Sequence, residues 1–488
     1  MNYEKLKSGT DIRGVASDKG GKSVTLTDSA VYDITAAFAV WLKAKLNKEK
    51  IKVSIGRDSR ITGPLIMERA QSALVNSGFT VLNCGLSSTP AMFMTTLDAD
   101  CDAAVQITAS HHPFDRNGLK FFTKNGGLNS ADIVEIISLA NEQKHLDCEK
   151  GMVIKTDFMQ SYSAHLRKLI CDSVGKTEAD LPLKNYKIIV DAGNGAGGFY
   201  AYDVLEKLGA DITGSQFLNP DGMFPNHIPN PENKDAMQSI KTAVLENGAD
   251  LGLIFDTDVD RAGCVDKEGE TINRNRLIAL ASYIAVNGEK GKTIVTDSVT
   301  SDGLHDYIEN YLGCNHYRFK RGYKNVINKA EEFCDSGIDT PLAIETSGHA
   351  AFKDNYFLDD GAYLVTKIVI ELAKGNDIEE ILKPLTIPAE EREVRFNILC
   401  DDFRGYGDEI IKKLEILANE NDEYCLAPDN REGLRVNTKN GWFLLRLSVH
   451  DPVVVVNFES RVNGGIAEDV EKLRPFLAQF TQLDISDL

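Results

Sequence analysis

Short apolar runs alternate with amphipathic stretches along the chain up to about position 385, in the pattern of α/β sheets. The first part shows the alternation clearly. Apolar runs at 52–56, 81–85 and 103–107 predict strands, and residues 66–74 carry a helical pattern between the first two.

The same pattern starts again twice. One unit begins at 186–191 and ends at 251–255, and the next begins at 292–296 and ends at 341–344. Each unit ends in a polar loop, and ligands of open α/β sheets bind where strands end. We therefore predict three similar α/β domains with mixed sheets, each contributing one loop to a site.

The last hundred or so residues read differently, as a smaller α+β domain. Helical patterns at 409–417 and 467–480 flank apolar runs at 433–436, 442–447 and 453–458. The predicted domain boundaries are 1–165, 166–288, 289–390 and 391–488.

Charge and composition narrow the class of protein. The formal net charge is −19, which disfavours nucleic acid and anionic membranes as partners. Nine scattered cysteines form no Cys-x-x-Cys pair, as is usual for a reducing compartment. No apolar leader and no run of membrane-spanning length appear, so we predict a cytoplasmic protein.

A serine in a loop after a buried strand is the first candidate for chemistry. Ser110 follows the run 103–107 within Thr108-Ala109-Ser110-His111-His112, and Lys120 comes shortly after. The combination suits a hydroxyl that carries a transferable group. A serine hydrolase is the rival interpretation, but the glycines of a Gly-x-Ser-x-Gly elbow are absent.

Three alternating carboxylates form the second candidate. Asp256, Asp258 and Asp260 follow the apolar run 251–255, and in an extended loop they would point to one side. Oxygen ligands of this kind suit Mg²⁺, which commonly shares them with phosphate. An EF-hand is disfavoured, because Arg261 stands where that loop needs glycine. A solvated acidic loop is the alternative.

Three further segments could bind a ligand. The loop 345–349 suits sugar hydroxyls but also reads as a turn or helix cap. Arg446 and Ser448 after a strand could hold a phosphate. The glycine-rich stretch 191–198 allows a dinucleotide site, yet we favour a tight strand-to-helix turn.

Taken together, the motifs resemble the α-D-phosphohexomutase superfamily, and within it the phosphomannomutase/phosphoglucomutase group. The resemblance covers essentially the whole chain, in order. It rests on the segments 9–14, 56–60, 108–113, 117–120, 220–226, 256–261 and 345–349.

The resemblance implies four domains around a central cleft and a phosphorylated Ser110. Mg²⁺ would be held by that phosphate and by Asp256, Asp258 and Asp260. Phosphate would pass between enzyme and sugar through a hexose 1,6-bisphosphate, which also serves as activator. The protein would be a monomer or homodimer that converts hexose 1-phosphate into hexose 6-phosphate, with glucose or mannose as the sugar.

The resemblance also implies a role for single residues. Lys120 and His349 would be the base and acid, with His111 beside the serine, and Arg13 and Arg261 would stabilise the phosphoryl group. The expected substrate-binding residues are Glu345, Ser347, Lys320, Arg446, Ser448 and His450.

The last-domain loop departs from the family pattern. His450 and Asp451 replace a threonine and a glutamate, and Val455 stands at a position where the family has arginine. Phosphate binding there would be weaker or shared with other groups. A catalytically weak sugar-phosphate binding protein therefore stays open as an alternative. A phosphoglucosamine mutase also stays open, because Ile344 replaces the glycine that the family usually has before the glutamate of the sugar loop, and Thr346 occupies a position that often reports substrate preference.

Overall fold

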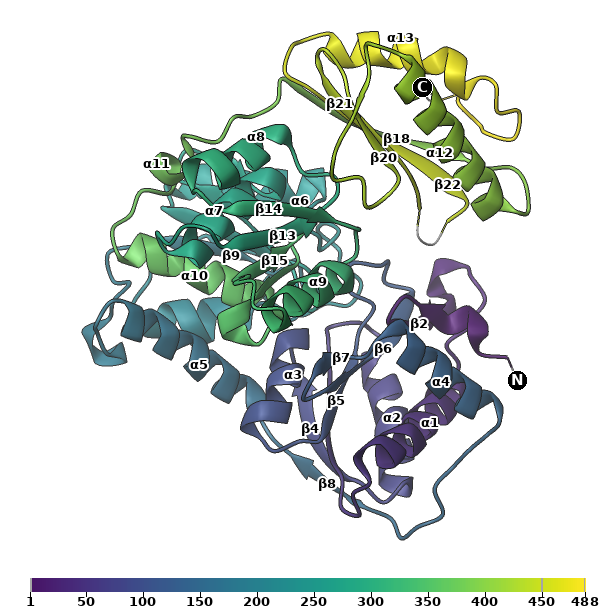
Figure 1. The fold of residues 1–488 in the computed structure, drawn as a ribbon. Helices are drawn as coiled ribbons and strands as arrows, with labels where there is room; N and C mark the ends of the chain where they lie inside the picture. Colours follow the sequence, from purple (N-terminus) through teal and green to yellow (C-terminus); the bar gives the residue numbers. More distant parts are fainter. Residues whose placement is uncertain (1, 449–450, 487) are drawn as a thin grey trace. The chain divides into compact units, whose positions relative to one another are not determined.

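The computed structural model describes residues 2–448, 451–486 and 488 (Figure 1). The chain divides into two compact units. Unit 1 comprises Met1–Ile284 and Ser347–Ile381, and unit 2 comprises Ala285–Thr346 and Leu382–Leu488.

Unit 1 begins with a mixed sheet in the order β1-β2-β6-β5-β3-β4-β8, with β7 paired to β6. Strands β3, β4, β5 and β8 run parallel, whereas β6 pairs antiparallel with both β5 and β2. The strands are β1 (Lys7–Ser8), β2 (Asp11–Val15), β3 (Lys52–Arg57), β4 (Thr80–Leu86), β5 (Ala103–Ile107), β6 (Arg116–Thr123), β7 (Gly126–Gly127) and β8 (Met152–Lys155).

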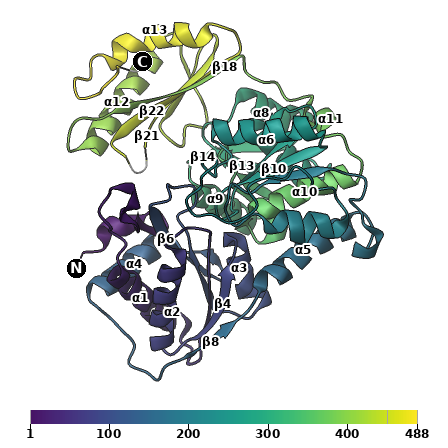
Figure 2. The same cartoon turned by 180° about the vertical axis from the view of Figure 1, so that it is seen from behind.

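Helices cover both faces of this sheet (Figure 2). Helices α1 (Asp28–Leu46), α2 (Gly63–Asn76) and α4 (Ser130–Asn141) bury one face, and α3 (Thr89–Asp98) packs on the other. Phe121 and Phe122 are neighbours on β6 and therefore point to opposite faces. Phe121 stacks on Phe38 of α1 with ring centroids 4.4 Å apart, and Phe122 meets Phe93 of α3.

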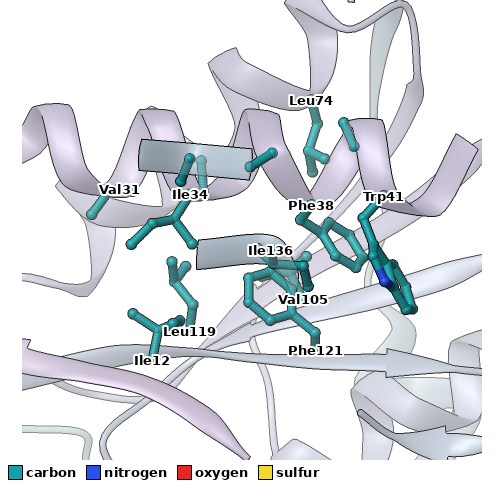
Figure 3. Packing of buried hydrophobic residues seen from close by; sticks show 14 of the residues in the cluster. Ile12, Val31, Ile34, Phe38, Trp41, Leu74, Val105, Leu119, Phe121 and Ile136 are labelled. Atoms are coloured by element: carbon teal, nitrogen blue, oxygen red, sulfur yellow. The ribbon is translucent and has the colours of Figure 1, made fainter. Parts of the chain in front are cut away.

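The core under α1 is mainly apolar. Figure 3 shows Phe38, Trp41, Val105, Leu119 and Phe121 packed together between helix and sheet. Each fully buried side chain of this size stabilises the fold by roughly 1.5–3 kcal/mol. The loop that follows β5 and precedes β6 is thus anchored at both ends in a packed core.

The second sheet of unit 1 has the order β12-β11-β10-β9. β9 (Ile188–Asp191) and β10 (Leu251–Phe255) are parallel, while β10 and β11 (Ala262–Asp266) form an antiparallel hairpin next to β12 (Thr271–Ile272). Helix α6 (Lys234–Asn247) packs on this sheet, and α5 (Phe158–Ser173) packs against α10 (Gly361–Ala373). The short strands β16 (Ala350–Phe352) and β17 (Leu358–Asp359) pair antiparallel.

Unit 2 contains three parallel strands and a separate antiparallel sheet. β14 (Asn315–Phe319) and β15 (Leu342–Ile344) flank β13 (Thr293–Asp297). The C-terminal sheet has the order β18-β22-β21-β20-β19, and helices α12 (Phe403–Glu420) and α13 (Gly465–Leu477) cover one face (Figure 1). Its strands are β18 (Glu390–Asn397), β19 (Cys425–Leu426), β20 (Leu434–Asn437), β21 (Gly441–Leu447) and β22 (Val453–Ser460).

The other face of the C-terminal sheet is polar in part. Arg435 stacks on Trp442 at 3.6 Å and donates a hydrogen bond of 3.0 Å to the carbonyl of Thr300. It also pairs with Asp302 at 2.7 Å. A buried arginine therefore joins the C-terminal sheet to the loop that follows β13.

The structure confirms the predicted fold class of α/β domains followed by an α+β domain. Strand β18 was not predicted from the sequence, because it alternates charged residues with only two buried apolar ones, Val394 and Phe396. Among the described residues, no helix combines the length and the hydropathy that crossing a bilayer requires.

Candidate active site

Ser110 lies in the loop between β5 and β6, and its side chain is almost completely buried. Its backbone has a φ of 50°, an uncommon value for a residue other than glycine, and its N–H donates to Thr108 Oγ1 at 2.9 Å. Its hydroxyl lies 3.1 Å from Asp256 Oδ2 and accepts a 3.0 Å bond from Arg261. His111 Nδ1 lies 3.3 Å from the same hydroxyl.

A buried arginine holds the Ser110 loop in place. Arg60 has no exposed surface, and it donates to the carbonyls of Ser110, His112, Pro113 and Arg116, the last three at 2.6, 2.7 and 3.0 Å. Asp58 balances its charge at 3.3 Å. Arg60 was not predicted as a site residue, although it lies just after β3 at the same edge of the sheet as Ser110.

The three aspartates lie in the β10–β11 hairpin, not in an extended loop as the alternation suggested. Residues 257–260 form turns, and Val259 adopts a φ of 69°. This left-handed conformation is strained for a β-branched residue and typical of functional loops. The hairpin still brings carboxylate oxygens of Asp256, Asp258 and Asp260 within 4.8 Å of one another.

The glycine-rich turn after β9 packs against this hairpin and donates a hydrogen bond to it. Ala196 N–H donates to the carbonyl of Thr257 at 2.8 Å. A Cβ atom on Gly195 would lie 2.6 Å from that carbonyl oxygen, so only glycine fits. The turn leads into a helical segment of π type, Tyr200–Leu205.

Lys120 and His349 approach Asp260 from two other parts of the chain. Lys120 on β6 donates to Asp260 at 2.7 Å. His349 Nδ1 lies 2.6 Å from Asp359 and 4.0 Å from Asp260. Asp359, another residue missed in the sequence, therefore fixes the orientation of the imidazole.

The donor set fits a divalent cation. Asp258 Oδ1 and Asp260 Oδ1 are buried and lack a hydrogen-bond partner among the described residues. The other oxygen of Asp258 accepts from Thr89, at the start of α3, where the helix dipole favours negative charge. Oxygens that are buried and unpartnered, from carboxylates in a tight group, are what Mg²⁺ prefers.

Burial and neighbouring charges shift the pKa values of the aspartates and of His111. Burial and the charges of Asp260 and Asp258 raise the pKa of Asp256 well above its usual range. Burial acts in the same direction on Asp260, but Lys120, His349 and Arg261 outweigh it and lower that pKa. Burial and the charge of Arg261 lower the pKa of His111, so its imidazole is neutral near pH 7.

Arg13 is the remaining candidate in unit 1. It lies on β2 beside Gly118 of β6 and pairs with Asp11 at 2.7 Å. Its charge lowers the pKa of both histidines that follow Ser110, after the larger effect of burial. We call the following group of side chains the serine site: Ser110, Lys120, Asp256, Asp258, Asp260 and Arg261.

The remaining candidates, except Ser347, belong to unit 2. Glu345 is buried and accepts a 2.6 Å bond from the N–H of Gly322, and Thr346 donates to Asp297 at 2.7 Å. Ser347, in unit 1, is largely buried, whereas Lys320 is exposed.

Arg446 lies at the end of β21, only 5 % exposed. Its Nε has no hydrogen-bond partner among the described residues, and its Nη atoms lie 3.9 Å from Glu432 and from Glu393. Ser448 Oγ accepts from the N–H of Asp451 at 3.3 Å. His450 lies outside the described residues.

The serine site combines a buried hydroxyl, two cations and three carboxylates suited to a cation. Such a constellation suits phosphoryl transfer, in which positioned cations stabilise the charge on the phosphoryl oxygens.

Comparison with known proteins agrees with a site for phosphoryl transfer. Family models of phosphoglucomutase/phosphomannomutase α/β/α domains I, II and III match residues 5–146, 160–269 and 273–387. A phosphoglucomutase of Neisseria gonorrhoeae is 31% identical over 93% of both chains. A phosphomannomutase/phosphoglucomutase of Pseudomonas syringae pv. tomato is 31% identical, covering 96% of this chain and 95% of its own.

A solved structure extends the likeness to the fold. The phosphoglucomutase/phosphomannomutase family protein of Burkholderia thailandensis is 26% identical and covers 98% of both chains with a TM-score of 0.81. The chain therefore belongs to the phosphoglucomutase/phosphomannomutase family, within the α-D-phosphohexomutases. It is a phosphohexomutase, an isomerase that acts on sugar phosphates.

Proposed function

We propose that Ser110 carries the phosphate that this phosphohexomutase transfers. The observation that supports the proposal is the position of its hydroxyl, within hydrogen-bond distance of both Asp256 and Arg261. In the transfer, the bond from phosphorus to Ser110 Oγ breaks while a bond to a sugar hydroxyl oxygen forms. The proton of that hydroxyl ends on Ser110 Oγ, and the product is a hexose 1,6-bisphosphate.

The return step uses the other phosphate of the bisphosphate. After the sugar has turned round, that phosphate passes back to Ser110 and leaves the isomeric hexose monophosphate. Lys120 and His349 exchange the hydroxyl proton as base and acid. His111, neutral and beside the hydroxyl, orients it. Arg13 and Arg261 stabilise the charge on the phosphoryl oxygens.

Asp256, Asp258 and Asp260 would hold Mg²⁺, together with an oxygen of the Ser110 phosphate. The ion would supply positive charge that offsets the charge of the phosphoryl oxygens. The unpartnered oxygens of Asp258 and Asp260 support this assignment.

Substrate binding falls to the remaining candidates. Glu345 and Ser347 bind sugar hydroxyls, and Lys320, Arg446, Ser448 and His450 bind the phosphate that stays on the sugar. We propose glucose 1-phosphate or mannose 1-phosphate as substrate and the cytoplasm as the location. The protein acts as a monomer or homodimer.

A coupled assay tests the proposal. Wild-type protein with Mg²⁺ and glucose 1,6-bisphosphate should convert glucose or mannose 1-phosphate, and Ser110→Ala should not. Ser163→Ala is the matched control, because Ser163 is buried in α5 and its hydroxyl has no partner among the described residues. Turnover of glucosamine 1-phosphate alone would contradict the proposed sugars.

A further inference from the structure

Three arginines of unit 2 surround one carboxylate. Glu393 Oε1 lies 3.2 Å from Arg395, and its Oε2 lies 3.9 Å from both Arg321 and Arg446. We call Arg321, Arg395 and Arg446 around Glu393 the arginine cluster.

The strand register brings two of these arginines to the same face. On β22, which lies between β18 and β21, Val455 pairs with Arg395 of β18 and with Arg446 of β21. Side chains of directly paired residues point to the same side of a sheet, away from the side covered by α12 and α13. Val455 between them is buried and uncharged.

Arg446 is the cation of the cluster with the weakest contacts, whereas Arg321 also pairs with Asp297 at 3.4 Å and Arg395 donates to Glu393 at 3.2 Å. Arg446 is 5 % exposed, its Nε has no partner among the described residues, and its two contacts at 3.9 Å exceed hydrogen-bond length. Burial and the nearby charge of Arg321 lower the pKa of Arg446. One buried and two partly exposed guanidinium groups this close together favour an anion with several acceptor oxygens.

Glu432 and Glu393, the two carboxylates that pair with Arg446, differ in their freedom to move. Glu432 accepts a 2.5 Å bond from Ser298 and a 3.0 Å bond from the N–H of Arg321, so it is fixed. Glu393 lies on the edge strand β18, and its side chain is 37% exposed. Its one bond to a neutral side chain is the 3.0 Å contact from Asn457. Glu393 has room to turn into solvent.

We propose that Arg395 and Arg321 act with Arg446 as ligands of the phosphate that stays on the sugar, and that Glu393 occupies their centre until this phosphate displaces it. The proposal rests on the proposed function for the identity of the ligand. A phosphate monoester offers three oxygens, enough for all three guanidinium groups, where one carboxylate offers two. Glu393 then competes with substrate and sets its affinity.

The test is calorimetric titration of full-length Ser110→Ala protein, in which turnover is blocked, with glucose 6-phosphate. Added Arg395→Ala should raise Kd about three- to tenfold, and Arg321→Gln should act in the same direction. Glu393→Gln keeps the shape but removes the charge and should lower Kd several-fold. Arg461→Ala is the matched control, an exposed arginine whose contact is the carbonyl of Lys439, and should leave Kd unchanged.

Two outcomes would overturn the inference. One is an unchanged Kd in Arg395→Ala and Arg321→Gln, with native circular dichroism. The other is weaker binding in Glu393→Gln. Titration with inorganic phosphate separates this inference from the proposed function. If Ser110 never gains phosphate but phosphate binding still depends on Arg395 and Glu393, only the proposed function fails.

Discussion

The serine site and the arginine cluster both handle phosphate in this account, but they are built differently. Every residue of the serine site is at most 4 % exposed, and the principal contacts of the site span 2.7–3.3 Å. In the arginine cluster, the side chain of Arg395 is 51% exposed, and Arg321 and Arg446 approach Glu393 only to 3.9 Å. The first is organised before a ligand arrives, and the second has to rearrange around one.

The difference in rigidity between the two regions predicts different effects on kcat and KM. Groups held rigidly next to the reacting atoms lower the barrier, so changes there should reduce kcat. Groups that close on a distant part of the substrate contribute binding, so changes there should raise KM.

Removal of the metal should have the largest effect. EDTA should reduce turnover by at least about a hundredfold, because the charge on the aspartates and the phosphoryl group would be unbalanced. Added Mg²⁺ should restore turnover and raise Tm, since it binds only the folded site. Asp258→Asn should weaken the response to Mg²⁺, as measured by titration. Full turnover in EDTA would remove the role given to the aspartates.

Weakening the contacts that hold the Ser110 loop should have the second-largest effect on turnover. Arg60→Lys keeps a charge but cannot reach four carbonyls at once, and the loop should lose its fixed geometry. We expect kcat to fall by about ten- to a hundredfold with little change in KM. Arg69→Lys, at a partly exposed arginine over Tyr32, is the control. A rise in KM alone would mean that Arg60 does not position the serine.

Arg446→Ala should act on binding. Loss of a charge-assisted contact of about 1.5–3 kcal/mol should raise KM about tenfold or more and leave kcat nearly unchanged. Steady-state kinetics with the preferred sugar phosphate give both values. An equal fall in kcat would show that the division between the two regions is wrong.

Much of the fold was predictable from the sequence because the buried strands are continuous apolar runs. Strands β5 and β10 begin and end where the apolar pattern does, at Ala103–Ile107 and Leu251–Phe255. β18 was missed because it is an edge strand with one solvated side, and alternating charges resemble a loop. The exact pairing of β18 with β22 depends on contacts far apart in sequence.

The site was predictable to a similar degree. Ser110 and the three aspartates stand directly after buried strands, where parallel sheets place ligand-binding loops. The turn at Val259 was not foreseen, because its left-handed backbone is imposed by the hairpin and not by the residue. Arg60 and Asp359 were missed for a related reason: their function lies in contacts with residues distant in the chain.

The most direct test of the central claim is the intact mass of the protein after incubation with glucose 1,6-bisphosphate. We expect one added phosphate on wild-type protein, mapped to Ser110 by peptide fragmentation, and none on Ser110→Ala. Ser163→Ala should gain the same phosphate as the wild type. A phosphate mapped to another residue, or full mutase turnover by Ser110→Ala, would contradict it.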